Sequence, residues 1–141
     1  RFVNVSELNV LGVASSYPNA LDDVKFREFF THDTHVLFAF HGYPSAIKQL
    51  LFDRPSIQRF HIYGYTERGT TTTPFDMLIR NGISRYHFAK RAVEHAAQSN
   101  QRIAARAPRF FAWCEQKIAE HRKYIIEEGH DPEDLDAWNW T

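Results

Sequence analysis

Cysteine is almost absent from this chain of 141 residues, in which Cys114 stands alone. A single cysteine excludes an intrachain disulfide and a zinc cage built from cysteines. It fits a reducing compartment, and we expect a cytoplasmic location. Excess charge is also absent, since Lys and Arg together number 17 and Asp and Glu together number 17. This balance argues against a general attraction to nucleic acid or to an anionic membrane.

Several other signals are missing. No apolar run is long enough for a membrane-spanning helix, and no signal-peptide pattern occurs. The Walker pattern, G-x-G-x-x-G, G-x-S-x-G and H-E-x-x-H are all absent. His32, Asp33 and His35 are metal-ligand types, but neighbouring side chains of a strand point to opposite faces, so we expect no metal site there. Cys114 falls inside a predicted helix, where we expect a buried, inert thiol.

The chain does contain enough apolar material for a core. Apolar residues make up 43% of it, and twelve residues are Phe. A chain of this length can bury roughly 68–70% of its unfolded surface. We expect residues 1–141 to form a single α/β domain. Because the sequence starts at Arg1 and not at methionine, we also expect the chain to be a piece of a longer protein.

Strand and helix patterns alternate in the first half of the chain, and the second half is mostly helical. The apolar run 35–40 is typical of a strand buried on both faces. We predict an α/β fold with a small, mostly parallel sheet flanked by helices. Strands are expected at 2–5, 35–40 and 60–65, with others possible at 56–58 or near Ile83. Helices are expected at 22–30, from Pro44, at 74–80, 84–97 and 108–128, and after Asp131, while 99–107 is ambiguous.

The most informative segment is the run 69–77, in which a glycine is followed by four threonines and a helix start. Thr73 suits the N-cap, Pro74 suits the first helical position, and Asp76 can answer the cap in a variant of the capping box. Two interpretations stay open for the loop: an anion seat at the helix N-terminus, or a contact with another protein surface. In either interpretation the residues that would make the contact are the same, namely Gly69, Thr70, Thr71, Thr72 and Thr73.

A second candidate loop, His41-Gly42-Tyr43, follows the run 35–40. If that strand and the one at 60–65 are parallel, loops 41–44 and 66–73 leave the same edge of the sheet and flank one crevice, where α/β sheets bind ligands. A histidine at a strand end can act as a base, although more often it satisfies backbone groups. We therefore predict His41, Gly42 and Tyr43 as interface or anion-contact residues, and no catalytic residue.

Several segments, taken in order, resemble one protein family. They are His41-Gly42-Tyr43-Pro44, the run 64–77, the segment 120–125 with Gly129, and Trp138-x-Trp140. These segments are similar to the C-terminal domain of phosphoketolase, and the likeness covers nearly the whole chain. The resemblance implies a fold like the C-terminal domain of transketolase.

The resemblance also implies a function for a longer protein. Phosphoketolases are dimeric aldehyde-lyases that use thiamine diphosphate and Mg²⁺. They cleave D-xylulose 5-phosphate, and often D-fructose 6-phosphate, with phosphate to acetyl phosphate and an aldose phosphate. The G-D-G…N signature for the diphosphate is absent here, so no catalytic residue carries over. We expect no cofactor or metal on this segment, and partners in the upstream domains of the same chain and a second subunit.

Three functions remain open from the sequence. The first is a structural and assembly domain that is inactive by itself. The second is a ligand-binding regulatory module that senses phosphate, a sugar phosphate or a nucleotide. The third is a hydrolase that uses His41, for which no nucleophile can be identified.

Overall fold

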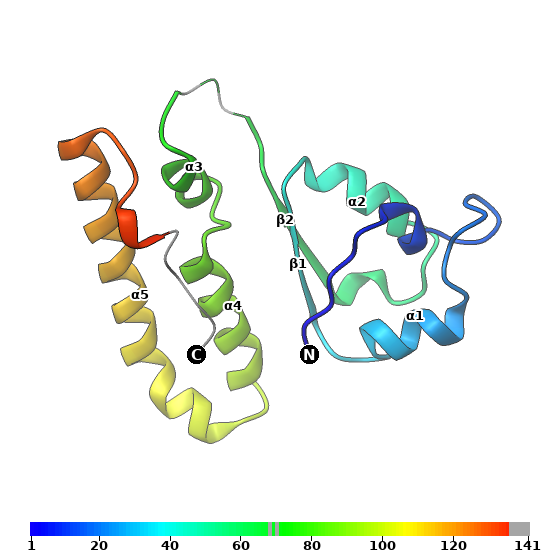
Figure 1. Cartoon of the computed structure of the whole chain (residues 1–141). Coiled ribbons are helices and arrows are strands. Elements are labelled where there is room, and N and C mark those ends of the chain that lie inside the picture. The colour runs from blue at the N-terminus through cyan, green and yellow to red at the C-terminus, as the bar shows by residue number, and fades with distance from the viewer. Residues whose placement is uncertain (68, 70, 136–141) are drawn as a thin grey trace. The chain divides into compact units, whose positions relative to one another are not determined.

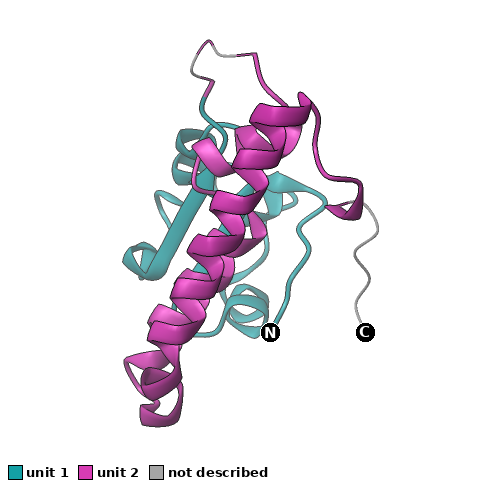
Figure 2. Cartoon of the chain, turned by 90° about the vertical axis from the view of Figure 1, so that its left-hand side faces the viewer, with its two compact units in different colours: residues 1–66 teal, residues 67–141 magenta. Residues whose placement is uncertain are grey.

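The computed structural model describes residues 1–67, 69 and 71–135, which fall into two compact units (Figures 1 and 2). The first unit spans Arg1–Thr66 and the second Glu67–Thr141. Each unit has a hydrophobic core of its own. The α/β class with a small parallel sheet is confirmed, while the single domain over residues 1–141 stays a prediction.

The first unit is built on two parallel strands, β1 (Val36–Phe40) and β2 (Phe60–Gly64). Their register pairs Val36 with Phe60 at one end and Phe40 with Gly64 at the other. The helix α2 (Pro44–Leu51) and the 3-10 turn η2 (Ile57–Arg59) lie between them in sequence, so β1, α2 and β2 form a βαβ unit. The core combines this unit with α1 (Asp23–Phe30) and η1 (Leu8–Leu11). Its buried members are Leu11, Phe26, Phe30, Phe38, Ile47, Leu51 and Phe60.

The strand predicted at residues 2–5 is wrong. Those residues have no strand pairing, although Val3 and Val5 are partly buried against the core. The weak alternation of apolar and polar residues here therefore reflects the partial burial of Val3 and Val5 and not pairing with a neighbouring strand. The further strands considered at 56–58 and near Ile83 are also absent from the described structure, because the first segment enters η2 and the second lies between two helices.

A buried arginine fixes the N-terminal segment of the first unit. The guanidinium of Arg54 donates to the carbonyl oxygens of Leu11 at 3.0 Å and Leu21 at 2.6 Å, and to the carboxylate of Asp23 at 2.9 Å. It also lies over the ring of Phe26, 4.2 Å from the centroid. The planar fork of arginine suits several acceptors at once, which explains how a charge can remain buried here.

The second unit is helical. It contains α3 (Pro74–Arg80), α4 (Arg85–Ala97), α5 (Gln101–Glu128) and the 3-10 turn η3 (Glu133–Leu135). The helices α4 and α5 form a hairpin along most of the length of α4 (Figure 1). Of the final helix predicted after Asp131, the described residues show this 3-10 turn. The residues Trp138 and Trp140 lie outside the described residues.

The predicted start of α5 at Pro108 is wrong. The helix begins at Gln101, because the side chain of Asn100 accepts hydrogen bonds from the amides of Arg102 at 3.0 Å and Ile103 at 3.3 Å. Pro108 lies inside the helix. The helix ends as predicted at Gly129, which has a φ of 76°. None of the helices that the structure describes is long and apolar enough to cross a membrane.

Candidate functional site

The first candidate site lies at the carboxyl end of the sheet in the first unit. Because β1 and β2 are parallel, the segments that follow Phe40 and Gly64 leave from the same end, as predicted. A side chain on Gly64 would collide with the carbonyl oxygen of Gly42, so the close approach of the two segments requires glycine there. The crevice predicted between loops 41–44 and 66–73 stays a prediction, because most residues of the second loop belong to the second unit.

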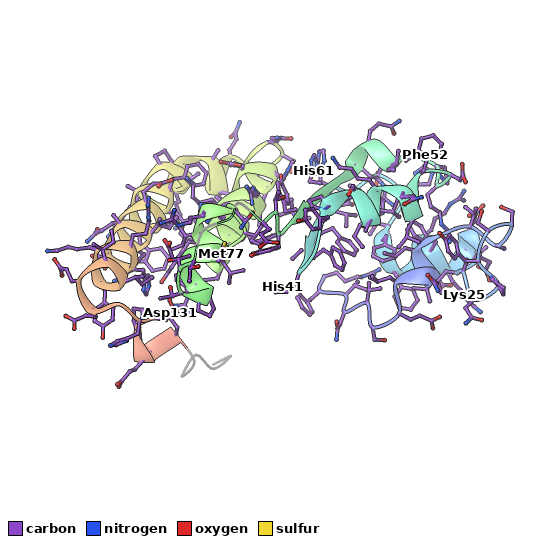
Figure 3. All side chains as sticks on the ribbon, turned by 90° about the horizontal axis from the view of Figure 1, so that it is seen from above. Lys25, His41, Phe52, His61, Met77 and Asp131 are labelled. Carbon is purple, nitrogen blue, oxygen red and sulfur yellow. The ribbon has the colours of Figure 1, made fainter. Side chains whose placement is uncertain are left out.

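The side chains of this loop face solvent. His41, labelled in Figure 3, is exposed, and its ring stacks on that of Tyr65 with a centroid separation of 5.7 Å. Tyr43 is 53% exposed. The ring contact of His41 is therefore with an aromatic side chain and not with a nucleophile. Exposed tyrosines such as Tyr43 are common on surfaces that contact other proteins.

The second candidate site is the N-terminus of α3. Thr73 is the N-cap as predicted, since its hydroxyl accepts from the amide of Asp76 at 3.3 Å and Pro74 occupies the first turn. A carboxylate oxygen of Asp131 accepts from the amide of Phe75 at 3.0 Å. Two amides of the first turn therefore already have acceptors within the chain. One acceptor is a carboxylate, which repels an incoming anion.

The carboxylate of Asp76 contacts other groups than the predicted capping box would give it. It is 3% exposed and accepts from the hydroxyl of Thr72 at 2.7 Å and from Nε of Arg80, and Nε of Arg122 lies 3.6 Å away. These partners link the threonine loop, α3 and α5. Burial by itself would raise the pKa of Asp76, but the hydrogen bonds from Arg80 and Thr72 and the charges of Arg80 and Arg122 outweigh it and lower the pKa. The group is a fixed anion and not a proton donor.

The predicted loop residues are placed only in part. Gly69 has a φ of 68°, which favours glycine, and Thr71 is exposed. Thr72 and Thr73 serve the start of α3, as described above. Thr70 lies outside the described residues.

A buried polar pair in the second unit was missed from the sequence. The hydroxyl of Tyr86 lies 2.8 Å from Nε2 of His121, and both side chains are buried. Burial, with the charge of Arg85 second, lowers the pKa of His121 and favours its neutral form. The sequence did contain a signal for the burial of His121, because this residue falls on one helical face with Cys114, Ile118 and Ile125. That spacing does not indicate Tyr86 as its partner.

Cys114 is fully buried, as expected, and burial raises the pKa of its thiol. A raised pKa keeps the sulfur as a thiol at neutral pH, so it is a poor nucleophile. One hydroxyl among the described residues does lie beside an imidazole, since Oγ of Ser84 is 2.7 Å from Nδ1 of His87. Ser84 is fully buried at the N-cap position of α4, so its hydroxyl does not face solvent.

By fold, the chain belongs to the α/β class, and it carries an exposed loop at the carboxyl end of a small parallel sheet. The family model described as "XFP C-terminal domain" matches residues 1–140, and the chain belongs to this family.

Curated relatives agree with this assignment. "Probable phosphoketolase 2" of Rhizobium meliloti is 41% identical over 140 residues, which is 99% of this chain and 18% of the relative. "Probable phosphoketolase" of Pseudomonas putida is 38% identical over 141 residues, and so is that of Rhodopirellula baltica; each match covers all of this chain and 17% of the relative. The predicted family is confirmed, and the chain spans less than a fifth of the length of these relatives.

Proposed function

We propose that this chain is the C-terminal structural and assembly domain of a phosphoketolase and has no turnover by itself. The observation that carries the proposal is the family match over residues 1–140, together with relatives named phosphoketolase that are several times longer. The full-length enzyme would be an aldehyde-lyase. It would convert D-xylulose 5-phosphate or D-fructose 6-phosphate, with phosphate, to acetyl phosphate and an aldose phosphate.

The cofactor implied for this reaction is thiamine diphosphate with Mg²⁺. Thiamine diphosphate supplies the electron sink for carbanion chemistry, and Mg²⁺ prefers oxygen ligands and retains water. The residues described here do not fit this group. The buried carboxylate of Asp76 is paired with two arginines, and one carboxylate oxygen of the half-buried Asp131 accepts from an amide of α3. We therefore derive no step through the cofactor from this chain, and we assign its binding to other parts of the full-length protein.

The role proposed for the chain is to support those other parts and the homodimer in the cytoplasm. The exposed side chains of His41 and Tyr43 and the exposed residues Gly69 and Thr71 offer surfaces for such contacts. No observation favours the regulatory module, because the first amides of α3 are used within the chain.

Acetyl phosphate formation tests the proposal. The isolated chain and the full-length protein are assayed with thiamine diphosphate, Mg²⁺, sugar phosphate and phosphate. We expect turnover from the full-length protein and none from the isolated chain. Turnover by the isolated chain would contradict the non-catalytic role, and an inactive but folded full-length protein would contradict the assignment to phosphoketolase.

A further inference from the structure

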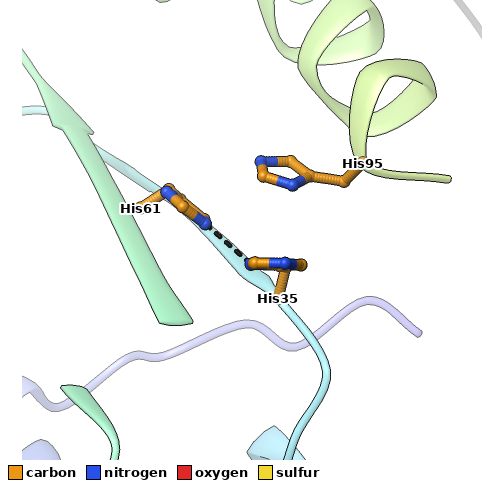
Figure 4. Close-up of side chains that lie close together, drawn as sticks. All are labelled: His35, His61 and His95. Carbon is orange, nitrogen blue, oxygen red and sulfur yellow. Dashed lines mark hydrogen bonds between the residues drawn. The ribbon is translucent and has the colours of Figure 1, made fainter. Parts of the chain in front are cut away.

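Two histidines meet near the amino ends of the strands in the first unit. His35 directly precedes β1, and His61 is the second residue of β2, where the register pairs it with Leu37. Nδ1 of His35 lies 2.9 Å from Nε2 of His61, and the ring centroids are 5.0 Å apart (Figure 4). His35 is exposed and His61 is half-buried, so solvent reaches the pair. The third histidine labelled in Figure 4, His95, belongs to α4 of the second unit.

The backbone that carries these two rings is held in place by Arg59, which lies two residues before His61. Its guanidinium donates to three carbonyl oxygens, one at the last residue of α1 and two in the segment between α1 and β1, at distances of 2.6–2.9 Å. The acceptors are Phe30, Thr31 and Thr34. Thr34 immediately precedes His35, so one arginine ties the entry of β1 to the entry of β2. Such support pre-organises side chains for a ligand.

The facing nitrogens are close to the spacing that a metal ion needs. With Zn–N bonds of 2.0–2.1 Å and tetrahedral angles, two imidazole nitrogens on one ion lie about 3.3 Å apart, so the pair must open by only about 0.4 Å. Each neutral ring can present a bare nitrogen if its proton sits on the other nitrogen, so binding needs a tautomer shift and no net loss of a proton. Imidazole suits Zn²⁺, Cu²⁺ and Ni²⁺ and does not suit Mg²⁺.

We propose that His35 and His61 form a binding site for a divalent transition metal ion, with water completing the coordination shell. The site depends on nitrogen ligands, so it selects against Mg²⁺. The inference is independent of the proposed enzymatic role, because its readout is metal binding and not turnover.

Calorimetric titration with Zn²⁺ tests this site. The full-length, metal-stripped protein is titrated in saturating Mg²⁺, which occupies oxygen-rich sites and leaves imidazole available. His35→Gln and His61→Gln each remove one ligand and keep a polar side chain. We expect the unaltered protein to show a Zn²⁺ binding step that Mg²⁺ does not block. Each variant should weaken the Zn²⁺ affinity of this step by at least about tenfold, the scale on which substitutions near metal sites lower metal affinity.

The matched control is His32→Gln, which removes an exposed histidine three residues before His35. It should retain the binding step seen in the unaltered protein. Circular dichroism checks that each variant is folded; if His61→Gln is not, the exposed His35 still decides the question. The proposal is overturned if the unaltered protein shows no such step, if His35→Gln binds Zn²⁺ equally well, or if His32→Gln loses as much affinity.

Discussion

At the scale of single residues, the start of α3 shows how a local signal and a distant one combine. The hydroxyl of Thr73 accepts from an amide three residues away, and the carboxylate of Asp131 accepts from an amide 56 residues away in sequence. The first contact follows from the order of the residues. The second exists only because the segment after α5 returns to α3.

Replacing Thr73 by alanine tests the local contact. Thr73→Ala removes the acceptor for the amide of Asp76 and should lower the free energy of unfolding by about 0.5–2 kcal/mol. Urea unfolding of the chain measures it. The control is Thr71→Ala in the same loop, whose exposed side chain should matter little. Equal effects of the two substitutions would show that the hydroxyl of Thr73 contributes nothing specific and that Asp131 suffices.

His121 makes stability depend on pH in a defined direction. Its pKa is lowered in the folded chain, mainly by burial and then by the charge of Arg85. The unfolded chain therefore binds the proton more readily, and stability falls as the pH drops below the ordinary histidine pKa of about 6.5. We expect the free energy of unfolding to decrease between about pH 7 and pH 5. His87, whose pKa is also lowered by burial, adds a slope of the same sign.

The variant His121→Gln isolates the contribution of His121. Glutamine can still hydrogen bond to Tyr86 but does not titrate in this range. Urea unfolding across this pH range should give a shallower slope than the unaltered chain. The matched control His32→Gln replaces an exposed ring and should retain the original slope. An unchanged slope in His121→Gln would contradict the prediction.

At the scale of elements, α5 contains a residue that its helix does not favour. Pro108 is exposed inside the helix, where proline cannot donate the backbone hydrogen bond that other residues make. The sequence suggested a helix start at this position for that reason. The side-chain cap at Asn100 and the packing of α5 on α4 override the preference.

Substitutions of two prolines compare the cost of proline inside a helix with its cost in the first turn of a helix. Pro108→Ala should raise the free energy of unfolding by up to about 3 kcal/mol, the difference between the two residues in a helix interior. The greater entropy of the unfolded alanine chain offsets about 0.4–1 kcal/mol of this gain. Pro74→Ala, at the first turn of α3, should give no such gain because the missing amide hydrogen costs nothing there. Urea unfolding compares them, and a neutral or destabilising Pro108→Ala would refute the expectation.

Element boundaries were predictable where a cap lies beside them. Asp22 accepts from the amide of Lys25 at 2.8 Å at the start of α1, and Gly129 ends α5. The parallel pairing of the two strands was also predictable from their apolar runs. The strand at 2–5 failed because apolar alternation reports which side chains are buried, and these pack on the core without a neighbouring strand.

At the scale of the whole molecule, the proposed role predicts a difference between the chain alone and the full-length protein. Tyr43 is 53% exposed in the chain. In the isolated chain, Tyr43→Ser should change the free energy of unfolding by no more than about 0.5 kcal/mol, as surface substitutions usually do. In the full-length protein it should lower the midpoint of thermal unfolding, because an apolar contact with another domain or subunit is lost.

The control for this comparison is Tyr43→Phe, which keeps the ring and removes only the hydroxyl. It should leave both proteins close to their original midpoints, as measured by differential scanning calorimetry. Equal behaviour of Tyr43→Ser in the two proteins would remove the loop 41–43 from the proposed contact surface.

The sequence by itself determined the family, the α/β class and the ends of several helices. These depend on motifs and on contacts between residues three or four positions apart, such as Thr73 with Asp76. Only the tertiary structure decided the pairs Tyr86–His121, His35–His61 and Phe75–Asp131, whose members are 35, 26 and 56 residues apart. Such pairs form when the hydrophobic cores bring distant segments together, and no local spacing encodes which polar groups then meet.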